Sequence, residues 1–196
     1  MTDTRQHILA TGRALVARRG YTGVGLSELL TQAGVPKGSF YHFFRSKEAF
    51  GCALLDSFVE GYADDLARTL GAPNLPARDR LLAYFQGWRT RQSGEDYEAR
   101  CLVVKLSAEV AELSPGMREV LDRGVSAIVA RLAAVIREGA EDGSLPAHSD
   151  PQALATTLYQ IWLGASLMGG LSRDTAPYDS ALAATAALID QQGPTS

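Results

Sequence analysis

The chain has 196 residues, of which 46% are hydrophobic and 21% charged, and its formal net charge is −3. This composition is ordinary for a folded globular protein and argues against intrinsic disorder. Residues 1–10 carry charges and no apolar stretch, and no window is apolar for long enough to span a membrane, which argues against a signal peptide and a transmembrane helix. The sequence therefore predicts a cytoplasmic protein.

Charge is distributed unevenly along the chain. Residues 1–50 hold seven Lys or Arg against three Asp or Glu, a net charge of +4, whereas residues 51–196 hold twelve against nineteen, a net charge of −7. A basic N-terminal part followed by an acidic remainder indicates that only the N-terminal part meets a polyanion.

The cysteines and histidines are scattered, with no spacing typical of a metal site: Cys52, Cys101, His7, His42 and His148. We expect no metal and no cofactor, and we expect both thiols to be free in a reducing compartment.

Apolar residues recur with a helical period almost throughout the chain. The predicted helices cover, within about two to four residues, 4–19, 26–33, 37–44, a long segment after the N-cap Ser46 that ends at Gly71, then 77–92, 98–112, 115–141, 151–171 and 177–190. No stretch alternates with period two for long enough to form a strand, so the predicted fold is all-α.

Two short helices in the N-terminal third are joined by a tight turn, as in a helix-turn-helix. Gly34 suits the left-handed position that closes the first of them, and Pro36 suits the start of the second. Phe40, Phe43 and Phe44 are expected to face inward. The small residues and hydrogen-bond donors expected to meet DNA are Pro36, Lys37, Gly38, Ser39, Tyr41, His42 and Lys47.

Residues 25–50, GLSELLTQAGVPKGSFYHFFRSKEAF, closely resemble the signature of the TetR family of regulators. The resemblance implies about nine helices: an N-terminal three-helix DNA-binding domain (residues 1–47) and a C-terminal helical ligand-binding and dimerisation domain (residues 48–196). It also implies a homodimer on a near-palindromic operator in double-stranded DNA, released when a ligand moves the fourth helix. The family usually has Thr or Ser where this chain has Gly25, so Ser27 is expected to take over part of that phosphate contact.

Cys101 is a candidate sensor. It is predicted to lie in the first turn of its helix, beside Arg100 and one turn before Lys105, and these three influences lower the pKa of a thiol. The alternative is that Cys101 is a small apolar filler of the core. Residues 100–110 together with 35–50 resemble the NemR/AcuR-like branch of the family, which is associated with reactive electrophiles such as quinones, aldehydes, maleimides or acrylate. Some relatives carry a lysine where this chain has Gly169 and Gly170, so chemistry that depends on that lysine is not expected.

Other residues have weaker assignments. Cys52 is expected to be core. Candidates to line a pocket beside Cys101 are aromatic residues and one methionine, which are more often plain core: Tyr62, Phe85, Trp88, Tyr159, Trp162 and Met168. Small and apolar residues suit close helix packing in a dimer and would serve equally in a monomer's core: Ala153, Thr157, Ile161, Gly164, Ala165, Met168, Leu182, Ala183, Ala186, Leu188 and Ile189.

The leading interpretation is a repressor released by an electrophile or small molecule at or near Cys101. Two alternatives remain within regulation: a non-covalent hydrophobic inducer with a structural Cys101, and activation instead of repression. A thiol-dependent enzyme is a remote alternative, because no His or acidic residue lies at a recognisable spacing from Cys101. A helical interaction module without DNA binding is disfavoured by the intact basic and polar set around residues 37–47.

Overall fold

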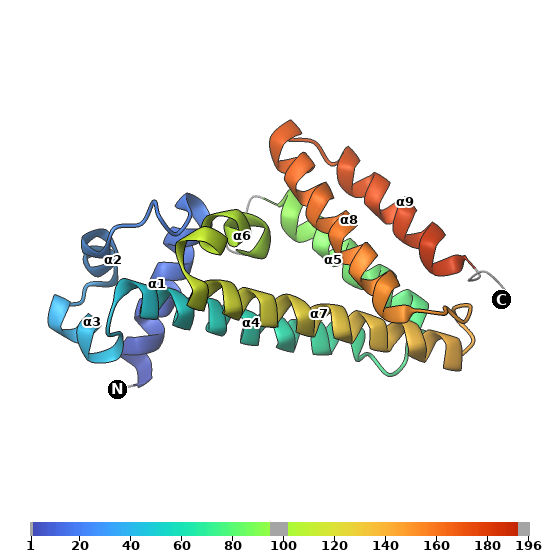
Figure 1. Cartoon of the computed structure of the whole chain (residues 1–196), viewed down its shortest axis with the longest axis horizontal. Helices are drawn as coiled ribbons and strands as arrows, with labels where there is room; N and C mark the ends of the chain where they lie inside the picture. Colours follow the sequence, from blue (N-terminus) through green and yellow to red (C-terminus); the bar gives the residue numbers. More distant parts are fainter. Residues whose placement is uncertain (1, 95–101, 192–196) are drawn as a thin grey trace. The chain divides into compact units, whose positions relative to one another are not determined.

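The computed structural model describes residues 2–94 and 102–191, and all regular secondary structure within these ranges is helical (Figure 1). The helices are α1 (Thr2–Arg19), α2 (Leu26–Ala33), α3 (Lys37–Phe43), α4 (Lys47–Leu70), α5 (Ala77–Ser93), α6 (Leu102–Leu113), α7 (Pro115–Glu141), α8 (Pro151–Ser172) and α9 (Ala176–Asp190). The predicted all-α class is confirmed. The predicted start of the sixth helix, at residue 98, lies outside the described residues.

The chain packs as two compact units. Residues 1–61 and 95–124 form the first, and residues 62–94 and 125–196 form the second, so that α4 and α7 each contribute to both. The predicted boundary between residues 47 and 48 divides the chain by function and stays a prediction. Of the helices that the structure describes, none is both long and apolar enough to cross a membrane.

The helix-turn-helix forms where its local signals predicted it. Gly34 ends α2 with φ 63°, in the left-handed region, and its N–H donates to the carbonyls at the end of that helix. Pro36 precedes the first residue of α3 with an extended backbone. Ser46 caps α4, because its Oγ accepts a hydrogen bond from the N–H of Ala49 at 3.0 Å.

An aromatic cluster holds α3 in the first unit. Phe40 and Phe44 are buried, and their ring centroids lie 5.7 and 5.2 Å from that of Phe50 on α4. Phe43 differs from the prediction, since it is only half-buried, with its ring 4.9 Å from that of the exposed His42. Two of three aromatic side chains are therefore enough to anchor this short helix.

The C-terminal end of α4 is satisfied by two arginines in the second unit. Arg80 donates to the carbonyl of Leu70 at 2.6 Å and to the carboxylate of Glu138 at 2.7 Å. Arg131 donates to the same two partners, at 3.2 and 3.0 Å. The carboxylate of Glu138 thus compensates the charges of both arginines, and both arginines satisfy a carbonyl at the C-terminus of α4.

Helices α8 and α9 run side by side as an antiparallel hairpin (Figure 1). Trp162 on α8 donates its indole N–H to the hydroxyl of Thr185 on α9 at 2.9 Å, inside the protein. Trp88 on α5 donates in the same way to Ser166 on α8 at 3.0 Å. Both indoles are thus buried with their polar atom satisfied.

Candidate functional site

The residues predicted to meet DNA gather on one exposed part of the first unit. Six of them are exposed: Ser27, Pro36, Lys37, Gly38, Tyr41 and His42. Ser39 and Lys47 are half-buried. Helix α3 supplies five of these eight residues, and it packs on the first unit through the buried Phe40. Hydrogen-bond donors along the exposed part of this helix are thereby free to meet a nucleic acid.

Gly38 has no structural reason to be glycine. Its φ is not positive, and among the described residues a Cβ built on it would meet no heavy atom within 4 Å beyond its chain neighbours and the backbone of its own helix. Helix propensity favours alanine over glycine at such a position. Nothing in the described part of the protomer therefore requires glycine at position 38.

Tyr41 and Lys37 lie together on the same exposed face. The ammonium of Lys37 is 5.8 Å from the centroid of the Tyr41 ring, and 46% of Tyr41 is exposed. A half-exposed phenol beside a cation offers both a donor and a flat apolar surface. This pair suits a phosphate and a neighbouring sugar or base edge.

Lys47 is engaged by Tyr21 from the link between α1 and α2. The Lys47 ammonium lies 4.8 Å from the centroid of the Tyr21 ring and donates to the Tyr21 carbonyl at 3.3 Å. In return, the Tyr21 hydroxyl donates to the Lys47 carbonyl at 2.7 Å. Burial, followed by the charges of nearby acidic groups including Cys52, raises the pKa of Tyr21 to about 12, so that this hydroxyl keeps its proton. Lys47 is held in one place at the start of α4.

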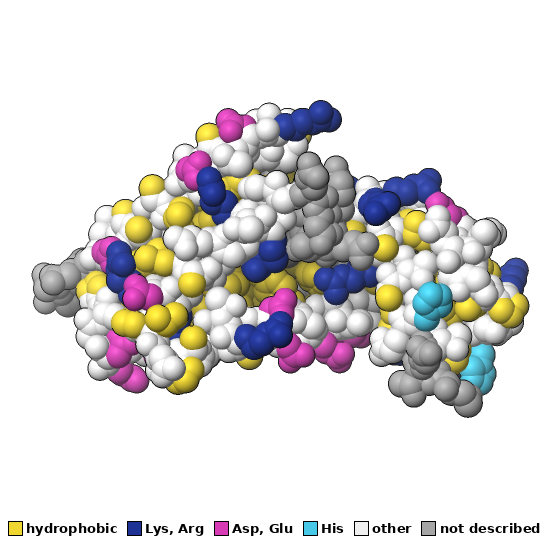
Figure 2. Space-filling view, turned by 180° about the vertical axis from the view of Figure 1, so that it is seen from behind, with side chains coloured by type: hydrophobic (Ala, Val, Ile, Leu, Met, Phe, Trp, Pro, Cys, Tyr) yellow, Lys and Arg dark blue, Asp and Glu magenta, His cyan; other side chains and the backbone are white. Residues whose placement is uncertain are grey.

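Surface charge follows the asymmetry of the sequence. Figure 2 shows few acidic side chains on the visible face of the N-terminal helices and more of them on the visible face of the second unit. Among the basic residues of this unit, Arg5 has its guanidinium carbon 5.5 Å from the centroid of the Phe44 ring. The distribution favours a polyanion at the first unit only.

Of the predicted sensor residues, Cys101 lies outside the described residues, together with Arg100. Lys105 is exposed on α6. Among the described residues, no group of three His, Cys, Asp or Glu side chains is placed to hold a metal ion.

The aromatic residues predicted to line a pocket pack against one another in the second unit. Phe85 and Trp162 stack with centroids 5.0 Å apart, and Trp88 meets Tyr159 edge to face at 5.4 Å. All four are buried, which agrees with the alternative that they are core residues. Two further candidates differ. Tyr62 is half-buried, with its hydroxyl 2.9 Å from that of Tyr84, and Met168 is 57% exposed, apart from this buried cluster.

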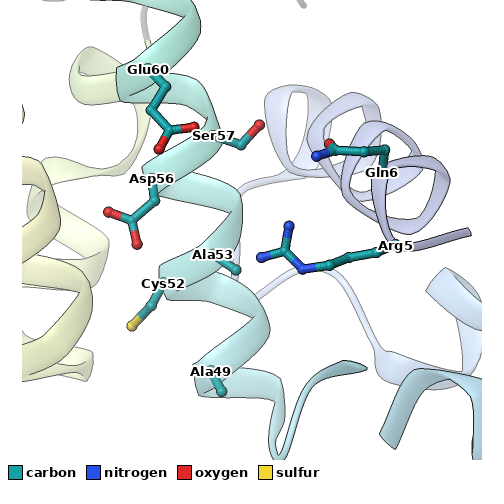
Figure 3. Close-up of a pocket in the computed structure, with 8 residues that line it drawn as sticks. All are labelled: Arg5, Gln6, Ala49, Cys52, Ala53, Asp56, Ser57 and Glu60. Atoms are coloured by element: carbon teal, nitrogen blue, oxygen red, sulfur yellow. The ribbon is translucent and has the colours of Figure 1, made fainter. Parts of the chain in front are cut away.

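Cys52 lines a surface pocket of about 760 Å³ in the first unit, contrary to the expectation of core (Figure 3). The lining residues come from α1 and α4: Arg5, Gln6, Ala49, Cys52, Ala53, Asp56, Ser57 and Glu60. The thiol points to the opposite side of α4 from Arg5 (Figure 3). Partial burial and then the carboxylates of Glu48 and Asp56 raise the pKa of this thiol, which makes it a weak nucleophile at neutral pH.

Glu109 on α6 is a residue that the sequence analysis missed. Its carboxylate accepts hydrogen bonds from the N–H of Tyr21 at 3.1 Å and from both the N–H and the hydroxyl of Thr22. The partners are 88 positions apart, so no local pattern indicates the contact. The only signal in the sequence was that Glu109 lies beside the apolar face of its predicted helix. Most glutamates in such positions are simply exposed to solvent, so this signal is weak.

Comparisons with known proteins place this arrangement among bacterial regulators. Residues 8–50 match the family described as bacterial regulatory proteins, tetR family, and residues 77–185 match the tetracyclin repressor-like C-terminal domain. The chain is 46% identical to the transcriptional repressor NemR of Escherichia coli over 92% of this chain and 91% of NemR. It is 32% identical to the transcriptional regulator AcuR of Cereibacter sphaeroides, over 89% of this chain and 80% of AcuR. The crystal structure of the reduced form of E. coli NemR superposes with a TM-score of 0.89, covering 93% of this chain and 95% of that one.

Proposed function

Because this chain belongs to the TetR family and is a transcriptional repressor of that family, we propose that it is a cytoplasmic homodimer that leaves its operator when an electrophile modifies Cys101. The operator is a near-palindromic duplex that takes one α3 from each protomer. Such half-sites repeat at roughly 34 to 36 Å along one face of DNA.

The observation that carries the DNA-binding part is the exposed start of α3. Gly38 has open space where a side chain would be, and the donors of Lys37 and Tyr41 lie near it on the same helix. A backbone without a side chain can approach a groove floor, while the neighbouring side chains reach phosphates and base edges.

A dimer accounts for an exposed apolar stripe on α8. Leu167 and Met168 are each 57% exposed and Leu171 is 81% exposed, while Gly164 and Gly170 leave open space beside them. Large apolar side chains next to small residues suit close packing against a second helix. We assign this stripe, together with the exposed face of α9, to the contact between protomers; Ala165 and Ile189, which the sequence also favoured, are buried within one protomer.

Two considerations support Cys101 as the trigger. The chain has two cysteines, and the raised pKa of Cys52 makes that thiol the poorer candidate, which leaves Cys101 by elimination. The relative that is 46% identical is a repressor for which a reduced form has been crystallised, so a redox state is distinguished for that relative.

The second candidate is a repressor with a non-covalent apolar inducer. The buried aromatic cluster of α5 and α8 is the surface that such a ligand would use. Because the rings of Phe85 and Trp162 already stack on each other, a ligand would have to open this packing.

The test measures operator affinity by fluorescence anisotropy on a duplex from the DNA upstream of the protein's own gene. Wild type is compared with Cys101→Ser and with the matched control Cys52→Ser, each before and after treatment with methyl-benzoquinone. We expect wild type and Cys52→Ser to release the duplex after treatment and Cys101→Ser to remain bound.

Release of all three proteins alike would refute Cys101 as the trigger and favour the non-covalent inducer. Catalytic consumption of the quinone by wild type, in place of stoichiometric modification, would favour the enzyme alternative.

A further inference from the structure

Glu109 fills an anion-binding turn in the DNA-binding unit. Gly20 ends α1 with φ 77°, in the left-handed region, and the N–H groups of Tyr21 and Thr22 then point toward the same place. Successive N–H groups after a left-handed residue form a concave site for an anion. In this protein the anion is the carboxylate of Glu109, from α6.

The fit leaves no room for another side chain at residue 20. A Cβ added to Gly20 would lie 2.8 Å from Oε2 of Glu109. Burial alone would raise the pKa of Glu109, but the hydrogen bonds from the Thr22 hydroxyl and N–H and from the Tyr21 N–H outweigh it and lower that pKa. The carboxylate is therefore ionised at neutral pH, and its hydrogen bonds are charge-assisted.

Tyr21 contacts both Glu109 and Lys47. Tyr21 binds the Glu109 carboxylate through its N–H and binds the Lys47 ammonium through its carbonyl. The Tyr21 hydroxyl also donates to the Lys47 backbone carbonyl. One residue thus joins α6 to the start of α4, where Lys47 is proposed to meet phosphate.

A second contact fixes the other end of α6. Ser114, which follows α6, donates its hydroxyl to the carboxylate of Glu48 in the first turn of α4 at 2.6 Å. The same hydroxyl accepts from the N–H of Met117 at 3.2 Å, in the first turn of α7. The C-terminal end of α6 is tied at two points, to the link between α1 and α2 and to the first turn of α4, which carries Lys47.

We propose that Glu109 is a positioning residue for operator binding: from α6 it sets the link between α1 and α2 and, through Tyr21, the placement of Lys47. The inference rests on the proposed function, because Cys101 directly precedes α6 and its modification would act on the helix that carries Glu109. A displacement of α6 then reaches Lys47 through hydrogen bonds that do not pass along α4.

The test uses untreated, reduced protein, so its outcome does not depend on Cys101. Glu109→Ala removes all three hydrogen bonds. Glu112→Ala is the matched control, because Glu112 is an exposed carboxylate on the same helix. Binding to the upstream duplex is measured by anisotropy at several salt concentrations. Exchange of the backbone amides of residues 20–24 is followed by mass spectrometry.

We expect Glu109→Ala to weaken operator binding by about tenfold, within the range of single coupling effects. It should also reduce the slope of log Kd against log salt by about 0.9 for each phosphate that the protein no longer neutralises. Lys47→Met should give the same reduction of slope, and adding Glu109→Ala to it should reduce the slope no further. A merely structural role would change stability without changing the salt slope.

Three results would overturn the inference: Glu109→Ala that binds like Glu112→Ala, exchange at residues 20–24 that is unchanged, or weakened binding with an unchanged salt slope. If Glu109→Ala does not fold, Thr22→Val removes the hydroxyl donor outside α6 and should shift affinity in the same direction by a smaller factor; unchanged affinity there would overturn it too. Failure of the Cys101 trigger has a different signature, since wild type and Cys101→Ser then respond to the quinone alike.

Discussion

Replacing Gly38 with alanine should make the protein more stable and a poorer DNA binder. Glycine in a helix costs about 0.5–1 kcal/mol relative to alanine, and less in the first turn, where residue 38 lies. Because a Cβ at this position has open space around it within the described protomer, no steric conflict opposes the gain. We expect the free energy of unfolding to rise by a few tenths to about 1 kcal/mol. For a chain of this size that corresponds to a Tm increase of at most about 4 °C.

The same methyl group should obstruct the groove. It projects from the exposed side of α3, and nothing in the protomer can move to absorb it. A displacement of about 1 Å lengthens a normal hydrogen bond from about 2.9 Å to beyond 3.5 Å, where it no longer counts as one. Breaking one specific interaction with a base costs about 1–3 kcal/mol. We therefore expect Gly38→Ala to weaken operator binding by roughly 5- to 150-fold.

Gly61 provides the matched control. It is exposed in the middle of α4, and a Cβ there likewise has open space around it among the described residues. Gly61→Ala should raise stability by about 0.5–1 kcal/mol and leave operator affinity unchanged. The assays are thermal unfolding by circular dichroism and anisotropy on the upstream duplex.

Equal operator affinity of Gly38→Ala and Gly61→Ala would refute the reasoning, because glycine would then not be needed for close approach to DNA. A lower Tm for Gly38→Ala would refute the other half, since it would show a steric conflict within the protomer.

Three further predictions follow from contacts described above. Leu171→Asp places a carboxylate in the exposed apolar stripe of α8, and analytical ultracentrifugation should find monomer with operator binding abolished. Glu138→Gln removes the charge that compensates two arginines and should lower the free energy of unfolding by about 1–3 kcal/mol, whereas the exposed Glu141→Gln should stay within about 0.5 kcal/mol. In the Cys101→Ser variant, Cys52 should react with iodoacetamide more slowly than free cysteine at about pH 7.5, because its raised pKa leaves less thiolate.

Each of these has a clear contrary result. A Leu171→Asp protein that sediments as a dimer would remove α8 from the proposed interface. Equal stabilities of the two glutamine variants would mean that the arginines are compensated elsewhere. Labelling of Cys52 as fast as free cysteine would show that its thiol is not unreactive, and the argument that leaves Cys101 as the trigger would fail.

Much of the DNA-binding part could be predicted from the sequence because its signals are local. Gly34 needed a left-handed backbone and Pro36 suited a helix start, and these two residues placed the end of α2 and the start of α3 where they are observed. Phe40 and Phe44 faced inward as their helical spacing required. Phe43 did not follow, since a helix of seven residues has room for only part of its circumference against the core.

The sensing part was less predictable. Cys52 lies next to the apolar stripe of its helix, yet it lines a pocket, because burial depends on what the neighbouring helices cover and not on position beside that stripe. Met168 shares its helix with buried tryptophan and serine residues but is exposed. Which face of α8 meets the protomer's own core and which remains open follows from how α5 and α9 pack against it.

The sequence by itself determined the all-α class, the helix limits in the N-terminal part, the charge asymmetry and the family resemblance, because each depends on residues within a few turns of one another. The tertiary structure decided that Glu109 reaches Tyr21, that the aromatic residues of α5 and α8 fill one another's space, and that Glu138 serves two arginines. Those contacts join residues from helices distant in sequence, and their geometry follows only from how the helices pack.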